Sequence, residues 1–202
     1  MKVVVFDYGA GNLHSLVKAV EAGGADVRVE RDPVAAARDA DALVLPGVGA
    51  FAAAAETLAP GREAMREAIA GGLPTLGICL GMQLLFDESE EGPGAGLGVI
   101  PGMVRRLQSR RIPQIGWNAV EDARPDESLF RAAPLDVAYY ANSYVCRPAA
   151  GDAPVIAWST HDDDRFPAAV RVGRAVGVQF HPEKSSRAGL AFVRAWVEEA
   201  GR

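Results

Sequence analysis

The sequence contains little of what disulfide frameworks and metal centres are built from. Its 202 residues include 2 cysteines and 3 histidines. No secretion signal accompanies Cys79 and Cys146, so we expect two reduced thiols rather than a disulfide. The histidines, His14, His161 and His181, show no zinc-like spacing to the cysteines. We therefore expect no metal and no cofactor.

Long apolar runs and an excess of positive charge are also missing. The apolar run of residues 3–6 is too short for a signal peptide, and no later run approaches the roughly 20 residues of a membrane-spanning helix. With 21 Lys and Arg against 26 Asp and Glu, the net charge is −5, which gives no electrostatic basis for binding nucleic acid or a membrane surface. We expect a cytoplasmic protein with neither partner.

Strand-like and helical runs alternate along the chain and predict an α/β fold. With 49% hydrophobic residues, the chain can bury a sizeable core as a single domain over residues 1–202. The alternation predicts a mostly parallel sheet with helices on both faces, and the shorter runs in the middle of the chain predict a small antiparallel addition. Expected strands cover residues 2–6, 26–30, 42–45, 73–78 and 175–180. Expected helices cover residues 13–22, 52–70 and 185–200, and the second of them should be broken near Pro60-Gly61. Shorter runs at residues 104–107, 137–140, 155–158 and 168–172 are assigned to the antiparallel part.

A cysteine stands between a strand-like run and a helical run in Gly77-Ile78-Cys79-Leu80-Gly81-Met82-Gln83. The flanking glycines have the G-x-C-x-G spacing of a nucleophile elbow, a tight turn that pushes one reactive side chain outward. We expect the start of a helix to stabilise the Cys79 thiolate and the Leu80 N–H to face a developing oxyanion. The alternative is that Cys79 is a small core residue, as most free cysteines in cytosolic proteins are.

A base for such a cysteine occurs near the end of the chain, in Gly177-Val178-Gln179-Phe180-His181-Pro182-Glu183. In extended backbone, residues i and i+2 face the same side, and Pro182 keeps the segment out of a helix. Glu183 can then hold one imidazole nitrogen and orient His181 as a base, which completes a Cys-His-Glu triad with Cys79. The alternative, a surface turn, fits poorly with the apolar run before it.

A glycine-rich loop, Pro46-Gly47-Val48-Gly49-Ala50-Phe51, follows the third expected strand. Ligands of open α/β sheets bind at the carboxyl ends of the strands. Gly47 and Gly49 let the peptide planes between them rotate and bring N–H groups close to a substrate. We therefore expect this loop to supply the second half of an oxyanion hole. The alternative is an ordinary loop between a strand and a helix.

Taken together, these segments resemble the class I (triad) glutamine amidotransferases, whose elbow has the form G-x-C-x-G-x-Q. Within that family the sequence looks like the glutaminase subunits of imidazole glycerol phosphate synthase over essentially the whole chain. The segments that carry the resemblance are Asp7-Tyr8-Gly9-Ala10-Gly11-Asn12, Pro46-Gly47-Val48-Gly49-Ala50-Phe51, Gly77 to Gln83, Ile115-Gly116-Trp117-Asn118 and His181-Pro182-Glu183-Lys184-Ser185.

The resemblance implies a flavodoxin-like α/β fold, that of the class I glutamine amidotransferases. It implies that glutamine is hydrolysed through a γ-glutamyl thioester on Cys79. It also implies a heterodimer with a separate cyclase subunit that is a (β/α)8 barrel. That subunit uses the ammonia to make imidazole glycerol phosphate and an aminoimidazole carboxamide ribonucleotide in histidine biosynthesis. The residues that the resemblance implies are Cys79 as nucleophile, His181 as base and acid, Glu183 as its orienter, Val48 and Leu80 as oxyanion donors, Gly47, Gly49, Gln83, Ser143 and Tyr144 around the glutamine, and Asn12, Trp117, Asn118 and Lys184 towards the cyclase.

The sequence departs from the family pattern at Gln114 and Asn142, where the family usually has histidine. Neither position belongs to the triad. Two other hypotheses remain: a related glutaminase that serves a different synthase, and a non-catalytic interaction module on a flavodoxin-like sheet. Gly116-Trp117-Asn118 favours the imidazole glycerol phosphate synthase subunit over the first of these, and the intact triad argues against the second.

Overall fold

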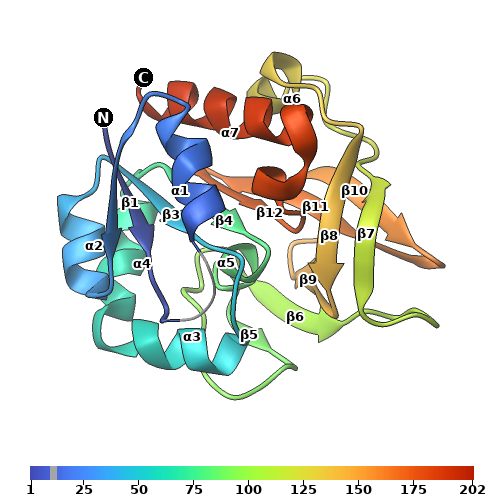
Figure 1. The fold of residues 1–202 in the computed structure, drawn as a ribbon. Helices are drawn as coiled ribbons and strands as arrows, with labels where there is room; N and C mark the ends of the chain where they lie inside the picture. The colour runs from blue at the N-terminus through green and yellow to red at the C-terminus, as the bar shows by residue number, and fades with distance from the viewer. Residues whose placement is uncertain (10–12) are drawn as a thin grey trace.

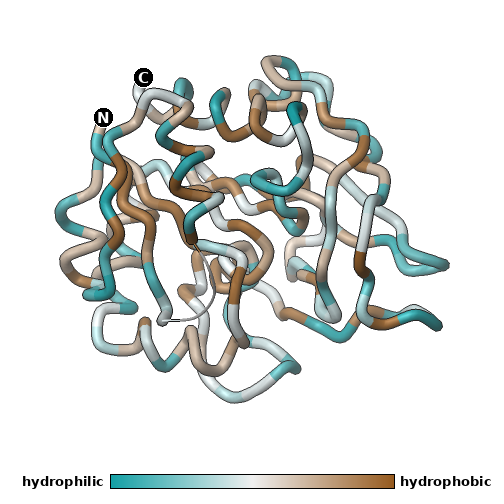
Figure 2. The backbone as a smooth tube through the Cα atoms, in the orientation of Figure 1, coloured by the Kyte–Doolittle hydropathy of each residue, from teal (hydrophilic) through white to brown (hydrophobic). Residues whose placement is uncertain are grey.

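Unbroken apolar runs form the strands at the centre of the computed structural model, which describes residues 1–9 and 13–202 (Figure 1). On β1 (Lys2–Phe6), Val3 and Val5 belong to one buried apolar cluster, and Val4 and Phe6 belong to another. Because successive side chains point to opposite faces, every residue of such a run is buried only when both faces of the sheet are covered. Figure 2 shows the hydrophobic colour concentrated along these inner strands.

The central sheet has the strand order of a flavodoxin-like fold. Within the described residues it contains seven strands, in the order β10-β11-β12-β4-β3-β1-β2. The strands other than β1 are β2 (Asp26–Glu30), β3 (Ala42–Leu45), β4 (Thr75–Ile78), β10 (Val155–His161), β11 (Asp164–Val172) and β12 (Ala175–Val178). The pairs from β12 to β2 are parallel, and β10 and β11 extend the sheet in antiparallel pairing. The predicted mostly parallel α/β fold is confirmed.

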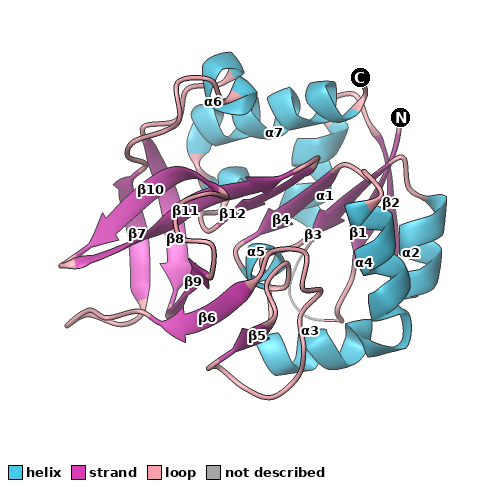
Figure 3. Ribbon diagram, turned by 180° about the vertical axis from the view of Figure 1, so that it is seen from behind, coloured by secondary structure: helices cyan, strands magenta, loops and turns pink. Residues whose placement is uncertain are grey.

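Helices cover the two faces of this sheet (Figure 3). One face carries α1 (His14–Glu21), α6 (Ser128–Ala132) and α7 (Ser186–Ala200). The other carries α2 (Pro33–Asp39), α3 (Phe51–Leu58) and α4 (Arg62–Ala70), with the short helix η1 (Ala59–Gly61) where the sequence predicts a break in one long helix. In the part of the chain that the structure describes, no helix has the length and apolar character needed to cross a bilayer.

The smaller sheets lie beside the carboxyl edge of the central sheet. β5 (Glu88–Ser89), β6 (Gly102–Arg106) and β9 (Tyr144–Pro148) form one of them, in which β6 and β9 are antiparallel but β5 and β6 are parallel. β7 (Gln114–Ala119) pairs with β8 (Val137–Asn142) in antiparallel orientation. The runs at residues 155–158 and 168–172, which the sequence pattern assigns to this part, instead belong to β10 and β11 of the central sheet. Their antiparallel pairing is as expected, but a strand's place in a sheet depends on long-range packing that the pattern does not encode.

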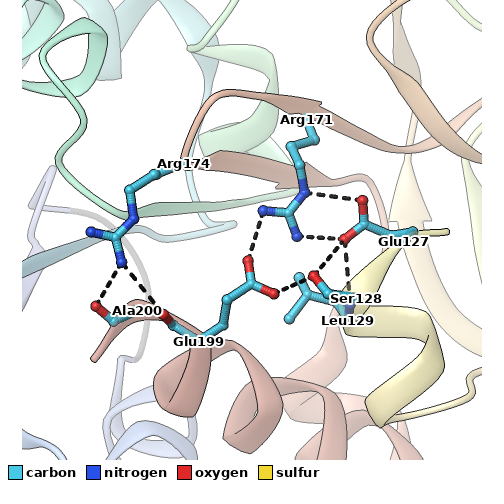
Figure 4. Close-up of polar contacts among 7 residues, drawn as sticks. All are labelled: Glu127, Ser128, Leu129, Arg171, Arg174, Glu199 and Ala200. Carbon is cyan, nitrogen blue, oxygen red and sulfur yellow. Dashed lines mark hydrogen bonds and ion pairs between the residues drawn. The ribbon is translucent and has the colours of Figure 1, made fainter. Parts of the chain in front are cut away.

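A partly buried group of charges holds the last helix against the sheet (Figure 4). Arg171 on β11 donates from Nε to Glu127 Oε2 at 3.0 Å, at the start of α6, and from Nη1 to Glu199 Oε1 at 2.7 Å, on α7. The Ser128 hydroxyl also donates to Glu199. Removing Arg171 would leave the buried Glu127 carboxylate without its charged partner, so the network resists displacement of α7. The short helix η2 (Pro182–Lys184), which carries Glu183, leads directly into α7.

Candidate active site

The carboxyl ends of β3, β4 and β12 lie side by side, because these strands are parallel neighbours. The glycine-rich loop leaves β3, Cys79 follows β4, and His181 lies just beyond β12. The register pairs Ile78 with Val178, and the Cys79 N–H donates to the Val178 carbonyl at 2.7 Å. Segments from three distant parts of the chain therefore meet at one edge of the sheet, where open α/β sheets bind their ligands.

Cys79 occupies a strained turn between β4 and α5 (Leu80–Gln83). Its backbone has φ 46° and ψ −102°, a conformation that residues with a side chain rarely adopt. A Cβ atom added to Gly81 would lie 1.9 Å from the Leu45 carbonyl oxygen, and one added to Gly77 would lie 2.6 Å from the Gly81 oxygen. The expected elbow is present, and its glycines are required by backbone contact. The helical run predicted to follow it is a single turn.

His181 stands between the cysteine and a buried carboxylate. Its Nδ1 and Glu183 Oε1 are 2.8 Å apart, and the two side chains are 3% and 9% exposed. Glu183 thus engages Nδ1, which leaves Nε2 as the ring nitrogen for Cys79. Burial disfavours a charged imidazole, but hydrogen bonds and charge interactions with Cys79 and Glu183 outweigh it and raise the pKa of His181 to about 9. The arrangement suits a base that becomes cationic beside a thiolate.

The loop after β3 packs directly against this pair. A Cβ atom on Gly47 would lie 2.9 Å from His181 Cε1 and 3.0 Å from Cys79 Cβ, so the backbone reaches the nucleophile because glycine occupies this position. Gly49 has φ +109°, which also favours glycine. Val48 lies between them and is half-buried. The oxyanion roles of the Val48 and Leu80 N–H groups stay predictions.

A cavity of about 310 Å³ opens over the Cys79 side chain. It is lined by the predicted Gly47, Gly49, Cys79, Leu80, Gln83, Ser143 and Tyr144, together with Glu91, Pro113, Ile115, Ala141 and Asn142. The Gln83 amide donates to the Tyr144 carbonyl at 3.1 Å, so these residues share one wall. Sequence reasoning missed Glu91, an exposed carboxylate whose Oε2 accepts a hydrogen bond from the Phe51 N–H at 2.9 Å. It stands in an acidic, glycine-rich stretch with no motif to mark it.

The two departures from the family pattern are cross-strand neighbours. Gln114 on β7 pairs with Asn142 on β8, and their side chains are 3% and 5% exposed. The Asn142 amide donates to the Tyr144 carbonyl at 3.2 Å. Among the described residues, the Gln114 amide and the Asn142 Oδ1 atom have no hydrogen-bond partner. The two amides stand where the resemblance leads us to expect histidine; both are buried, and Asn142 lines the cavity.

The residues expected to face a partner subunit differ in their surroundings. Trp117 is 56% exposed and packs edge to face on Tyr139, with ring centroids 6.2 Å apart. Lys184 is exposed. The Asn118 amide instead donates to the Thr160 carbonyl at 2.9 Å, which turns it towards its own chain. Asn12 lies outside the described residues.

Metal ligands do not gather here. Within residues 1–9 and 13–202, no group of three or more His, Cys, Asp and Glu side chains is arranged to hold a metal ion. The groups that do meet at the site are a thiol, an imidazole and a carboxylate.

Comparison with known proteins decides the family. The model of the class-I glutamine amidotransferase family matches residues 4–198. The chain belongs to this family. Among curated amidotransferase relatives, the imidazole glycerol phosphate synthase subunit HisH of Leifsonia xyli subsp. xyli is 46% identical over 205 residues, with 96% of this chain and 97% of the relative covered. The protein of the same name from Symbiobacterium thermophilum is 47% identical over 201 residues, with 96% and 92% covered.

Solved amidotransferase structures share the fold. A putative GMP synthase protein from Thermoplasma acidophilum superposes with a TM-score of 0.74 at 19% identity, covering 100% of this chain and 94% of that one. At such low identity, the likeness concerns the fold alone. The resemblance to the imidazole glycerol phosphate synthase subunits, in contrast, is confirmed by the curated relatives.

Proposed function

We propose that this chain is the glutaminase subunit of an imidazole glycerol phosphate synthase. It hydrolyses glutamine to glutamate and ammonia, and it supplies the ammonia to a cyclase subunit that forms imidazole glycerol phosphate and an aminoimidazole carboxamide ribonucleotide in histidine biosynthesis. The observation that carries the proposal is the contact of His181 with both Cys79 and Glu183 at the carboxyl edge of the sheet. The family and its curated relatives support it.

Acylation begins when the Cys79 sulfur attacks the side-chain amide carbon of glutamine. A carbon–sulfur bond forms, and the electron pair of the carbonyl moves to its oxygen, which accepts hydrogen bonds from the Leu80 and Val48 N–H groups. When the tetrahedral intermediate collapses, the carbon–nitrogen bond breaks and the nitrogen takes a proton from His181. Ammonia leaves, and the γ-glutamyl group remains on Cys79 as a thioester.

In deacylation, His181 accepts a proton instead of donating one. A water molecule gives a proton to His181 as its oxygen attacks the thioester carbon, and collapse then breaks the carbon–sulfur bond. Glutamate leaves with the oxygen of that water, and the sulfur departs as a thiolate beside the protonated His181. Glu183 keeps Nδ1 engaged through both steps, so Nε2 always faces the reacting atoms.

The cavity walls would orient the glutamine. Gln83, Ser143 and Tyr144 contact its polar groups, and Glu91 supplies a negative charge that suits the α-ammonium group. A substrate held at both its charged end and its amide cannot slide away from the sulfur. Such positioning turns the attack into an effectively intramolecular step.

The cyclase subunit would be a (β/α)8 barrel in a heterodimer with this chain, docked on the face that carries Ile115 and Trp117. These apolar side chains are 68% and 56% exposed, and Ile115 also lines the cavity, so a partner seated there could receive ammonia without its passage through bulk water. Lys184, which follows Glu183 on η2, adds a positive charge near this edge. Asn118 supports the face from behind through its bond to Thr160.

The deciding experiment replaces Cys79 by alanine and supplies either glutamine or an ammonium salt at high pH. With a purified cyclase subunit present, Cys79→Ala should abolish glutamate formation but leave the ammonium-dependent cyclase reaction intact, because only the first needs a nucleophile. Cys146→Ala is the matched control. Burial raises the pKa of the Cys146 thiol well above its ordinary range, which keeps it protonated and unreactive. Glutamate formation near the wild-type rate in Cys79→Ala would overturn the proposal.

A further inference from the structure

Gln179 is a polar side chain enclosed in the protein next to the nucleophile. It lies between β12 and His181 and is 0% exposed, with apolar Val178 and Phe180 on either side in sequence. Its backbone N–H donates to the Ala168 carbonyl at 2.9 Å, which fixes its place at the end of the strand. Burying an amide is unfavourable unless both of its ends find partners.

Both ends of the Gln179 amide have partners, and one of them is the catalytic sulfur. Nε2 lies 3.4 Å from Cys79 Sγ, and Oε1 lies 3.4 Å from Gln83 Nε2. Gln83 Nε2 also donates to the Tyr144 carbonyl at 3.1 Å. A backbone carbonyl can only accept, so the NH₂ end of Gln83 faces Tyr144 and Gln179, and the carbonyl end of Gln179 must face Gln83. The NH₂ end of Gln179 is therefore the end that faces Cys79.

We propose that Gln179 is a further catalytic residue, whose amide donates a hydrogen bond to the Cys79 sulfur and stabilises it as a thiolate in the correct position. This proposal rests on the glutaminase function proposed above. A hydrogen bond to an ionised acceptor favours the ionised form, and the effect is larger in a buried site. A neutral Cys79 thiol would donate its hydrogen to the Ala141 carbonyl, which lies 3.9 Å from Sγ. That hydrogen bond is long, so it favours the neutral thiol less than the Gln179 amide favours the thiolate.

Gln179 and His181 differ in how they can serve the sulfur. His181 gives its proton to the leaving nitrogen and recovers one from water, so its charge changes during the cycle. The Gln179 amide does not titrate, and its N–H stays available when the sulfur attacks and again when it leaves the thioester. The hydrogen bond from Gln83 sets the orientation of the Gln179 amide, which connects the substrate wall of the cavity to the nucleophile.

The experiment compares Gln179→Met and Gln179→Glu with the matched control Gln108→Met, since Gln108 is exposed on the surface. Methionine keeps the volume and removes the donor; glutamate keeps the shape and an acceptor for Gln83. Two quantities are measured on the full chain: the iodoacetamide alkylation rate of Cys79 as a function of pH, with the modified peptide identified by mass spectrometry, and the steady-state glutaminase rate with the cyclase subunit.

We expect both Gln179 variants to move the alkylation profile of Cys79 to higher pH and to lower kcat by about tenfold to a hundredfold, in line with a hydrogen bond to a charged group. KM should change little, and Gln108→Met should match the wild type. An alkylation profile unchanged in the folded variants would overturn the proposal, even if stability falls, because a structural amide would affect folding only. Should Gln179→Met fold poorly, the profile of Gln179→Glu decides. The alkylation arm needs no substrate, so it separates this proposal from the glutaminase assignment.

Discussion

At His181, specific partners outweigh the general effect of burial. An imidazole placed in an apolar interior would lose its proton more easily than in water, yet Cys79 and Glu183 raise its pKa to about 9 from an ordinary 6.5. The imidazole of His181 can therefore carry its proton at neutral pH while it is enclosed in the protein. Its two neighbours, Cys79 and Glu183, are the groups that favour this charged form.

This shift predicts a pH dependence of stability. The folded protein binds the His181 proton more tightly than the unfolded chain, so the stabilisation is fully present below pH 6.5 and is lost as the pH rises through about 9. Urea unfolding measures the free energy of unfolding at pH 6.5 and at pH 9.5. The decrease between these two pH values should be smaller in His181→Asn than in the wild type. Cys79→Ala, which removes one of the two partners, should fall between them. Equal losses in all three proteins would contradict the assigned charge state.

Sequence patterns could predict which three side chains meet at the edge of the sheet, but not the residues around them. His181 and Glu183 are two positions apart, so local backbone geometry alone brings their side chains together. Glu91 stands in a stretch without a motif, and Gln179, two positions before His181, has no signature that marks it as functional. The pairing of β12 with β4 brings Gln179 to Cys79, and long-range packing brings Glu91 to the cavity. Asn118, which the resemblance assigns to the partner face, donates its amide to the Thr160 carbonyl of its own chain, and its role towards a partner stays a prediction.

At the scale of elements, the elbow depends on the close approach of the backbone at Gly81, in α5, to the backbone at Leu45, the end of β3. Gly81→Ala would place a methyl group 1.9 Å from the Leu45 carbonyl oxygen, and neither backbone can yield cheaply. We expect a loss of unfolding free energy of at least about 1–3 kcal/mol, the usual range for overpacking. Gly201→Ala, where the nearest atom would be 3.7 Å away, is the control. Urea unfolding measures both; equal stabilities would mean that the elbow is looser than described.

The alternation of strands and helices predicts the parallel sheet, but it does not predict the order of the strands in that sheet. β10 and β11 look like any short strands in sequence, and their attachment to β12 depends on contacts across the whole chain. The helix α2 was missed for a different reason. Asp32 caps it by accepting from the N–H groups of Val34 and Ala35, and Pro33 opens it, so the signals of a helix start were present. The helix has only 7 residues, of which Pro33 and Ala36 are buried, so its apolar pattern is too short to stand out in the sequence.

For the whole molecule, the loop between Gly47 and Gly49 predicts dependence on the partner. The peptide that joins Gly47 to Val48 can present either its carbonyl or its N–H to the substrate, and one missing oxyanion donor costs roughly a hundredfold to a thousandfold in rate. A partner that prefers one orientation would therefore switch the glutaminase on. We expect the isolated chain to be a poor glutaminase that is activated by the cyclase subunit loaded with its ribonucleotide substrate.

This dependence is measured by comparing glutamine hydrolysis by the chain alone, with the empty cyclase subunit and with the loaded one. The empty cyclase subunit is the control, because it shows how much activation comes from subunit contact without the ribonucleotide. Moving the loop from 1:99 to 99:1 requires about 5.5 kcal/mol of differential binding, so the loaded complex should far exceed the empty one if the ligand drives the change. A lone chain as fast as the loaded complex would mean that the oxyanion hole is already formed.

The place of β12 in the sheet has a consequence for synthesis. This strand inserts between β11 and β4, and it is made after nearly all of the rest of the chain. A growing chain that has already emerged past Cys79 still lacks its base, and the parallel pairing that brings the two together spans a long stretch of sequence, which makes it a slow, late contact. We therefore expect the sheet to be completed and the proposed catalytic residues to be assembled in the same step, so a nascent or truncated chain should not consume glutamine.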